Sequence, residues 1–279
     1  MLVSPYEMLK DAKEKQYAVG AFNYYNLDTM NAVIQAAEEE RSPAILQLYT
    51  ADFTTQGGSV MAAATLEAIR KAKVPLALHL DHCNAFQYIV QAIHCGFNSV
   101  MFDGSSMPLE ENIALTKKVV ELAHYDDVFT EAEIGPIYRI GESKETVQDK
   151  LADVDECARL VSETGVDSLA PAIGTAHGIY TEAPKIDFDR LGKINDRVNI
   201  PLVLHGGSGI PDEMIRQAIS LGVLKINYGT MLKHTWSKTM KEKLDQGELE
   251  IRKLIPMARD AVKEVAKRQL RLFGSSGKA

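Results

Sequence analysis

Eight short apolar runs recur along the chain, and each is followed by a segment whose apolar residues lie three and four positions apart. The first pattern is typical of buried parallel strands and the second of amphipathic helices. Two of the helical segments read LDTMNAVIQAAEEE and PLEENIALTKKVVELAH. Repeated strand–helix units of this number predict an α/β fold, a (β/α)8 TIM barrel. The runs cover residues 18–24, 44–50, 75–82, 99–105, 128–135, 168–174, 201–207 and 223–229.

The chain has no linker rich in Gly, Ser or Pro, so residues 1–279 are expected to form a single barrel domain. The segment from Glu248 onward has a helical pattern and is expected to pack outside the barrel as extra C-terminal helices. The longest piece without such a pattern, residues 136–153, is polar and charged. It is too long for a routine connection between strand and helix, so we expect a mobile loop over the site.

The composition restricts the class of partner. A net charge of −7 disfavours nucleic acid or an anionic membrane surface as the main partner and favours a small molecule. Cys83, Cys95 and Cys157 lack CxxC spacing, and the amino end lacks the pattern of a signal peptide. No apolar run reaches the roughly 18 residues of a membrane span. These features predict a cytoplasmic protein with reduced thiols.

Polar residues gather at the expected carboxyl ends of the strands. Active sites of (β/α)8 barrels are built at this end. Because the strands are parallel, their carboxyl ends share one mouth, and the side chains there are expected to meet. The residues are Asn23, Thr50, Asp81, His82, Asp103, Glu131, Glu133, His177, His205, Asn227 and Thr230.

Three histidines in this set indicate a metal site. A single histidine is more often an ordinary hydrogen-bonded residue, but His82, His177 and His205 come from three different strands. Three imidazoles with carboxylates nearby are typical of a catalytic zinc site that keeps one position open. His79 shares the strand face of Asp81 but lies deeper, so we expect a structural role for it. The histidines expected in solvent, on helices or helix ends, are His94, His124 and His234.

The stretch HGGSGIP, residues 205–211, is a glycine-rich turn that opens a helix. Backbone amides that glycine leaves bare at a helix start bind phosphate oxygens. In (β/α)8 barrels a phosphate site commonly lies after strands seven and eight, where HGGSG and NYGT lie in this chain. A plain tight turn is the alternative, and the adjacent histidine favours the phosphate interpretation.

With these motifs the chain resembles the class II, metal-dependent ketose-bisphosphate aldolases, which include the fructose- and tagatose-bisphosphate aldolases. The similarity spans nearly the whole chain, and its clearest segments are YAVGAFN, HLDH, GFNSVMFDGSSMP, EAEIG, TGVDSLAPAIGTAHGIY, HGGSGIP and FGSS. The AIGTAHG and HGGSGIP segments are closer to the tagatose branch. The resemblance implies reversible aldol cleavage of a ketose 1,6-bisphosphate to dihydroxyacetone phosphate and an aldehyde such as glyceraldehyde 3-phosphate.

The resemblance also implies roles for individual residues. His82, His177 and His205 would hold Zn2+, and Asp81 would protonate the aldehyde oxygen as the new hydroxyl forms. Three carboxylates would serve a second metal position and orient the histidines: Asp103, Glu131 and Glu133. A larger set would bind substrate, with its arginine on the distal phosphate: Asn23, Thr50, Gly178, Gly206, Gly207, Ser208, Asn227, Tyr228, Gly229, Thr230 and Arg259. A monovalent cation, Na+ or K+, near two of these glycines is also typical of the family.

The chain departs from the family pattern at two places. Thr50 stands where the family usually has serine, which keeps the hydroxyl and adds a methyl group. After EAEIG the family usually continues with two glycines and an acidic pair on a mobile loop, whereas Tyr138 and Arg139 stand here. We predict that Glu142 is the base that moves the substrate proton, and that Arg139 favours an acidic or phosphorylated aldehyde.

Two rival interpretations stay open at this point. Lys225 on the eighth strand could be the nucleophile of a Schiff-base aldolase on the same barrel, although such an enzyme would not need three histidines. The altered loop also permits a sugar-phosphate-binding paralogue without turnover. The aldehyde partner is left open as well, and so is the choice between a homodimer and a homotetramer.

Overall fold

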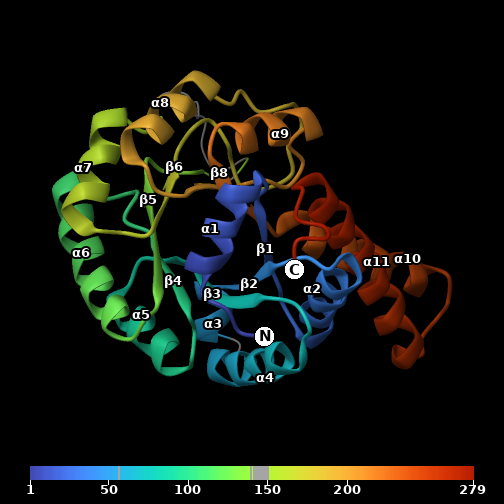
Figure 1. Cartoon of the computed structure of the whole chain (residues 1–279). Coiled ribbons are helices and arrows are strands. Elements are labelled where there is room, and N and C mark those ends of the chain that lie inside the picture. The colour runs from blue at the N-terminus through green and yellow to red at the C-terminus, as the bar shows by residue number, and fades with distance from the viewer. Residues whose placement is uncertain (56, 139, 141–150) are drawn as a thin grey trace.

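The computed structural model describes residues 1–55, 57–138, 140 and 151–279. Eight parallel strands close into a barrel in chain order, with β8 hydrogen-bonded to β1 (Figure 1). The strands are β1 (Val19–Asn23), β2 (Ala44–Tyr49), β3 (Leu76–Cys83), β4 (Ser99–Phe102), β5 (Phe129–Ile134), β6 (Ser168–Pro171), β7 (Leu202–Leu204) and β8 (Val223–Tyr228). The predicted (β/α)8 TIM barrel is therefore confirmed.

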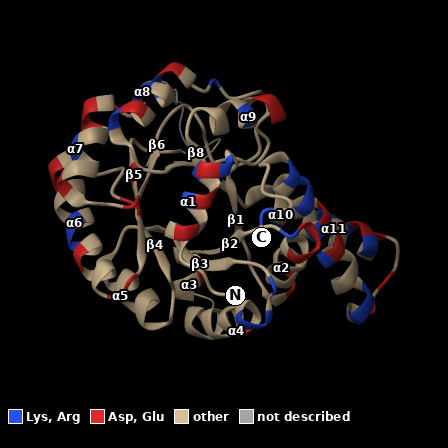
Figure 2. Ribbon diagram, in the orientation of Figure 1, with Lys and Arg blue, Asp and Glu red and all other residues tan. Residues whose placement is uncertain are grey.

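The helices are α1 (Pro5–Lys15), α2 (Leu27–Glu40), α3 (Thr50–Thr55), α4 (Gly58–Lys71), α5 (Phe86–His94), α6 (Leu109–Tyr125), α7 (Val154–Thr164), α8 (Phe188–Val198), α9 (Asp212–Ser220), α10 (Thr230–Asp245) and α11 (Ile251–Leu272). Helices surround the barrel, and Figure 2 shows most of the Lys, Arg, Asp and Glu residues on the helices, whereas the strands are largely uncharged. None of the helices described is long and apolar enough to cross a membrane.

Helix α1 covers the amino end of the barrel (Figure 1), and the sequence patterns did not anticipate it. It begins after Ser4, whose side chain accepts a hydrogen bond from the Tyr6 amide, and Pro5 occupies its first turn. Its apolar face, Met8 and Leu9 included, is buried against the barrel floor, which therefore excludes water. The floor residues in contact with it are Val19, Ala21, Ile45, Ala77, Phe129 and Leu224.

Side chains that face the barrel interior change from apolar to ionisable along the axis. Alternate residues of a strand share one face, and on β5 these are Phe129 in the floor, then Glu131, then Glu133. All three side chains are buried. The same order holds on β3, with Ala77, His79 and Asp81. On both strands the ionisable side chains therefore follow the apolar floor residue, toward the carboxyl end.

The C-terminal helices lie outside the barrel, as predicted. Helix α11 packs against α2 and α10, and the hairpin of α10 and α11 projects from the side of the barrel (Figure 1). Glu39 accepts ion pairs from Lys263 and Lys267, which fastens α11 to α2. The three cysteines are free thiols. Much of the predicted 136–153 loop, including Arg139 and Glu142, lies outside the described residues.

Candidate active site

Three histidine rings meet at the carboxyl mouth of the barrel. The centroid of the His82 ring lies 4.8 Å from that of His177 and 4.8 Å from that of His205, and the latter two are 6.0 Å apart. One nitrogen from each ring lies within 4.8 Å of the other two. His82 comes from β3, His177 from the loop after β6 and His205 from the residue after β7. Residues far apart in the sequence thus form one cluster of donor atoms.

The backbone at His82 explains how two consecutive residues reach the same mouth. Successive side chains of a strand point to opposite faces, so Asp81 and His82 would ordinarily diverge. His82 adopts a left-handed conformation with φ of 50°, and the pairing of β3 with β4 shifts register between Leu80 and Cys83. A residue with a Cβ atom is strained in this conformation, and strained backbone of this kind is concentrated at functional sites. The twist turns the imidazole back toward the other histidines.

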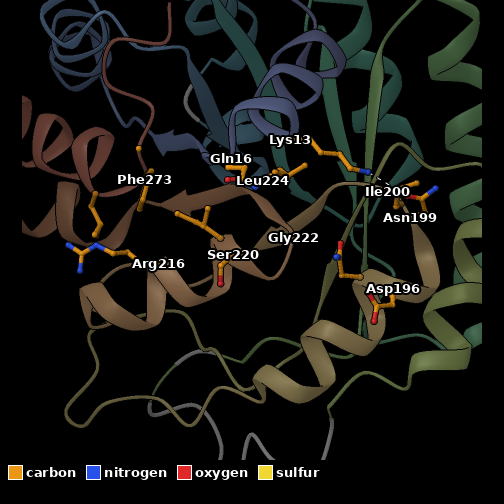
Figure 3. Close-up of a pocket in the computed structure, with 14 residues that line it drawn as sticks. Lys13, Gln16, Asp196, Asn199, Ile200, Arg216, Ser220, Gly222, Leu224 and Phe273 are labelled. Atoms are coloured by element: carbon orange, nitrogen blue, oxygen red, sulfur yellow. Dashed lines mark hydrogen bonds between the residues drawn. The ribbon is translucent and has the colours of Figure 1, made fainter.

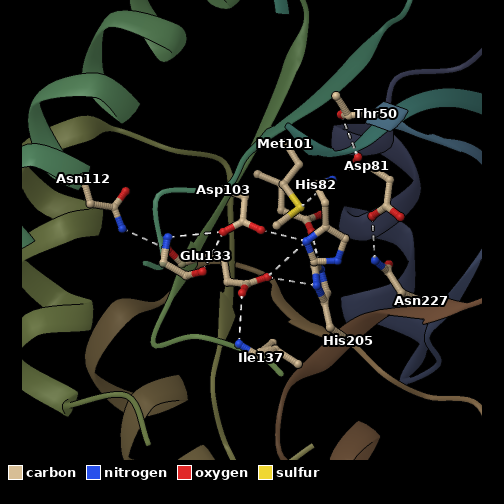
Figure 4. A network of polar contacts seen from close by, with 12 residues as sticks. Thr50, Asp81, His82, Met101, Asp103, Asn112, Glu133, Ile137, His205 and Asn227 are labelled. Atoms are coloured by element: carbon tan, nitrogen blue, oxygen red, sulfur yellow. Dashed lines mark hydrogen bonds and ion pairs between the residues drawn. The ribbon is translucent and has the colours of Figure 1, made fainter. Parts of the chain in front are cut away.

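A carboxylate contacts one nitrogen of the His82 ring and one nitrogen of the His205 ring. The Nδ1 atom of His82 lies 2.9 Å from Oδ2 of Asp103 (Figure 4). Nε2 of His205 lies 2.8 Å from Oε1 of Glu131. Nε2 of His82 and Nδ1 of His205 are buried and make no hydrogen bond. A carboxylate on one ring nitrogen fixes the tautomer and leaves the other nitrogen's lone pair for a metal. The cluster therefore fits a metal with imidazole ligands.

Glu133 lies close to both His205 and His82. Its Oε2 atom is 3.1 Å from Nδ1 of His205 and 3.7 Å from Nδ1 of His82. With His82 and Asp103 it forms a second group of converging donor atoms. Burial and the adjacent Asp103 raise the pKa of Glu133. Asp103 and Glu133, two of the three carboxylates predicted to serve a second metal position, thus lie together beside His82.

Glu131 lies behind His205 and belongs to neither group. Its Oε2 atom accepts an ion pair of 2.7 Å from Nζ of Lys225, and both side chains are fully buried. Burial lowers the pKa of His205, but the carboxylates of Glu131 and Glu133 outweigh burial and raise it to about 10. A metal held by His205 would have to displace a proton from this ring, and its binding would therefore depend on pH.

Asp81 is held from both sides by amide groups. Nδ2 of Asn23 donates to Oδ2 at 2.8 Å. Nδ2 of Asn227 donates to Oδ1 at 3.2 Å (Figure 4). Burial raises the pKa of Asp81, but the positive potential of His82 and His205 outweighs it and leaves the pKa below its ordinary value. The carboxylate is fixed at the edge of the histidine cluster, where it can exchange a proton with a bound molecule.

Two glycine turns adjoin this cluster at the ends of β7 and β8. A Cβ atom at Gly206, where φ is 68°, would lie 2.3 Å from the carbonyl oxygen of Ala176, so only glycine fits. The Gly207 amide donates to the Asn227 carbonyl at 3.1 Å. Ser208 accepts a 3.4 Å hydrogen bond from the Met231 amide in the first turn of α10. The predicted phosphate residues of the two turns are therefore neighbours at a helix start, which suits an anion.

A model described as fructose-bisphosphate aldolase class-II matches residues 3–278 of the chain. The chain belongs to the class-II fructose-bisphosphate aldolase family. It is 45% identical to the probable fructose-bisphosphate aldolase of Bacillus subtilis, over 100% of this chain and 99% of the relative. It is 43% identical to the 6-phospho-5-dehydro-2-deoxy-D-gluconate aldolase of Halalkalibacterium halodurans, over 100% and 98%. The crystal structure of the YdjI aldolase from Escherichia coli K12 superposes with a TM-score of 0.91 at 38% identity, covering 100% of both chains.

As a member of this family the chain is an aldolase, a carbon–carbon lyase, and the family is metal-dependent.

A separate cavity of about 730 Å3 lies at the amino end, between α1, α8, α9 and the C-terminal segment (Figure 3). Lys13 and Arg216 line it together with apolar residues such as Leu224. The residues described as lining it include none of the three histidines. This cavity and the histidine cluster therefore lie at opposite ends of the barrel.

The structure places five predicted site residues away from the histidines or at the margin of the cluster. Tyr228 is buried, with its ring 6.3 Å from that of Phe22, and burial raises its pKa to about 12. Arg259 lies on α11 outside the barrel wall, with Nε 3.9 Å from Asp260. Thr50 donates to the Asp81 carbonyl at 3.0 Å. The other marginal residues are Gly229, beside Asn23, and Thr230, the first residue of α10.

Two residues of the aldolase site were missed by sequence reasoning. Gln47 donates to Oδ1 of Asn23 at 2.9 Å and thereby orients the amide that holds Asp81. A polar residue inside the apolar run AILQLYT was a detectable signal for it. Tyr180 hydrogen-bonds the backbone at Ala176 and Gly206, and no pattern in the sequence marks this contact. The predicted structural role of His79 agrees with its 2.7 Å contact to Ser99.

Proposed function

We propose that this aldolase catalyses zinc-dependent, reversible cleavage of fructose- or tagatose-1,6-bisphosphate to dihydroxyacetone phosphate and glyceraldehyde 3-phosphate. The observation that carries the proposal is the convergence of His82, His177 and His205 beside the amide-held carboxylate of Asp81. Zinc bound by the three imidazoles would act as a Lewis acid on the ketone carbonyl. Nitrogen ligands and one open position suit zinc in this role.

Asp81 would exchange the proton of the substrate hydroxyl. In cleavage its carboxylate accepts the proton of the C4 hydroxyl as the carbon–carbon bond breaks, and in condensation it returns that proton to the aldehyde oxygen. Asn23 and Asn227 keep the carboxylate oriented through both directions. A lowered pKa keeps Asp81 ionised and ready to accept the proton.

The glycine turns would bind the phosphate of the dihydroxyacetone half. The backbone amide of Gly206, the Ser208 hydroxyl and the start of α10 lie together beside the histidines. The Gly207 amide holds the turn in place by donating to the Asn227 carbonyl at 3.1 Å. Such a grip fixes the reacting carbons relative to Asp81, and orientation of this kind contributes much of an enzymatic rate. We further propose that Na+ or K+ binds near Gly178 and Gly206, that Arg259 meets the distal phosphate and that Glu142 moves the substrate proton.

The Schiff-base rival is disfavoured by the environment of Lys225. A nucleophilic lysine must lose its proton, whereas Lys225 is buried in an ion pair with Glu131. A metal-free amine mechanism would also leave the three histidines without a use.

A second candidate substrate deserves equal testing because of one relative. The 6-phospho-5-dehydro-2-deoxy-D-gluconate named for the Halalkalibacterium halodurans aldolase carries a carboxylate where a bisphosphate carries its second phosphate. At 43% identity that relative is almost as similar as the fructose-bisphosphate aldolases. An acidic aldehyde agrees with the predicted contribution of Arg139.

The deciding experiment compares cleavage of three substrates by zinc-loaded protein: the two bisphosphates and the phosphorylated deoxy-gluconate. Released dihydroxyacetone phosphate is measured by its reduction with a coupled dehydrogenase. Faster turnover of a bisphosphate supports the first proposal, and faster turnover of the acid supports the second. Binding of all three without turnover would support a paralogue that has lost its activity.

We propose that the aldolase acts in the cytoplasm as a single domain and assembles as a homodimer or homotetramer. The free thiols agree with a reducing compartment. Leu249, between α10 and α11, is 77% exposed, and Ile251, the first residue of α11, is 62% exposed. The projecting hairpin offers these apolar side chains to a second copy. Light scattering of the purified chain gives the assembly size.

A further inference from the structure

The Tyr180 hydroxyl connects two loops that carry predicted metal ligands. It accepts a hydrogen bond from the Ala176 amide at 2.7 Å and shares its proton between the carbonyl oxygens of Ala176, at 2.8 Å, and Gly206, at 3.2 Å. Ala176 precedes His177 and Gly206 follows His205. One side chain therefore ties the backbone beside both histidines.

His177 depends on such bonds more than the other two histidines do. His82 is part of β3 and His205 follows the last residue of β7, whereas β6 ends at Pro171, well before His177. The amide of His177 donates to the Tyr138 carbonyl, and its carbonyl accepts from the Ile140 amide, both at 2.8 Å. The segment that carries His177 is thus held by hydrogen bonds from loop backbone and from the Tyr180 hydroxyl, and not by the strand pairing of the sheet.

The contact between the two loops is close and leaves little freedom. The Cβ position of Gly206 lies 2.3 Å from the Ala176 carbonyl oxygen, so the two segments touch. The Tyr180 ring lies against Gly209 of the glycine turn, with Cδ2 3.5 Å from its Cβ position. Burial raises the pKa of Tyr180 to about 12, so the hydroxyl keeps its proton near neutral pH.

We propose that Tyr180 is a positioning residue whose hydroxyl fixes the spacing of His177 and His205 and thereby sets the affinity of the site for zinc. This inference rests on the proposed zinc function and adds a residue to it. Loss of an outer partner of a metal ligand typically weakens metal binding roughly 10- to 100-fold. Tyr180 acts on the two histidines through the backbone. We therefore expect removal of its hydroxyl to change the zinc dissociation constant more than the melting temperature of the protein.

The test is Tyr180→Phe, which removes the hydroxyl and keeps the ring. Zinc dissociation constants are measured at equilibrium against a chromogenic chelator, together with the melting temperature of the metal-free protein. The matched control is Tyr24→Phe, since Tyr24 is also buried and its hydroxyl accepts a 2.9 Å hydrogen bond from Thr65. We expect a roughly 10-fold or greater loss of zinc affinity for Tyr180→Phe and an unchanged affinity for the control.

The absorption spectrum of the cobalt-substituted protein gives a second readout, because it reports ligand geometry. A changed spectrum in Tyr180→Phe and an unchanged one in Tyr24→Phe support the proposal. Zinc affinity within twofold of the parent overturns the role of Tyr180 and leaves the zinc function standing. Failure of the parent chain itself to bind zinc overturns the zinc function and this inference with it.

Discussion

The Nδ1 atom of His82 lies 2.9 Å from the Oδ2 atom of Asp103, and Asp103 in turn accepts hydrogen bonds from the amide and hydroxyl of Ser105. The ring is therefore oriented by a carboxylate that is itself held in place. This chain of contacts directs Nε2 of His82 toward the other two histidines.

Asp103→Asn should weaken zinc binding roughly 10- to 100-fold, because the amide supports the ring less well than the carboxylate. The measurement is a chelator competition titration. Asp167→Asn is a suitable control, since Asp167 also contacts a histidine, His124, but at the protein surface. Equal losses in both variants would show that the effect is general and not specific to the site.

Removal of metal should abolish carbon–carbon cleavage, and added zinc should restore it, because the three imidazoles form the predicted binding set. Activity is followed before and after dialysis against a chelator. His205→Ala should lower bound zinc below one ion per chain, whereas His124→Ala should leave it unchanged. Turnover that persists in metal-free protein is incompatible with the proposed mechanism.

Asp81→Asn should reduce turnover by roughly two to four powers of ten while zinc content stays the same, since this is the range expected for removal of one acid–base group. Steady-state kinetics and metal analysis of the same preparation provide the two measurements. An unchanged rate would remove Asp81 from the proton transfer. Lost zinc would instead identify it as a ligand.

Lys225→Met should destabilise the fold by about 3 kcal/mol, because it leaves the Glu131 carboxylate buried without its cation. Urea unfolding of the variant and of the double variant Lys225→Met, Glu131→Gln measures the effect, and the double variant should recover part of the loss. Borohydride added to the parent protein with dihydroxyacetone phosphate should give no mass increase. A reduced adduct on Lys225 would revive the Schiff-base mechanism.

Glu142→Ala should stop exchange of the dihydroxyacetone phosphate proton with solvent, because Glu142 is the predicted base. Proton exchange is followed by nuclear magnetic resonance in deuterium oxide. If exchange continues, Glu133 becomes the next candidate. Arg139→Gly should shift preference away from the acidic aldehyde, and an unchanged substrate order would mean that this loop position does not select the aldehyde.

The sequence predicted the barrel well because its evidence was local and repeated. Every apolar run contains a strand, and strand ends of parallel sheets converge by topology, which is why the approach of His82, His177 and His205 could be anticipated. Helix α1 escaped notice, although Ser4 and Pro5 are start signals of the usual kind.

Other features could not have been predicted from patterns. Strand alternation places Asp81 and His82 on opposite faces, and only the left-handed backbone at His82 overrides it. The Tyr180 contact depends on how closely two loops approach, and Glu131 acts on His205 from another strand. Such relationships are set by distances across the barrel and have no signature in neighbouring residues.

The change from an apolar floor to an ionisable mouth divides the barrel into two regions for protein engineering. At the mouth, Thr50 is only partly buried and can be varied to screen for new aldehydes, whereas Asn23 has to stay because it holds Asp81. Floor residues such as Ile45 are fully buried and contribute to thermal tolerance. Between them lies the pair of Glu131 and Lys225. Substitutions of these two residues that change the reactivity of the site will also change the yield of folded protein.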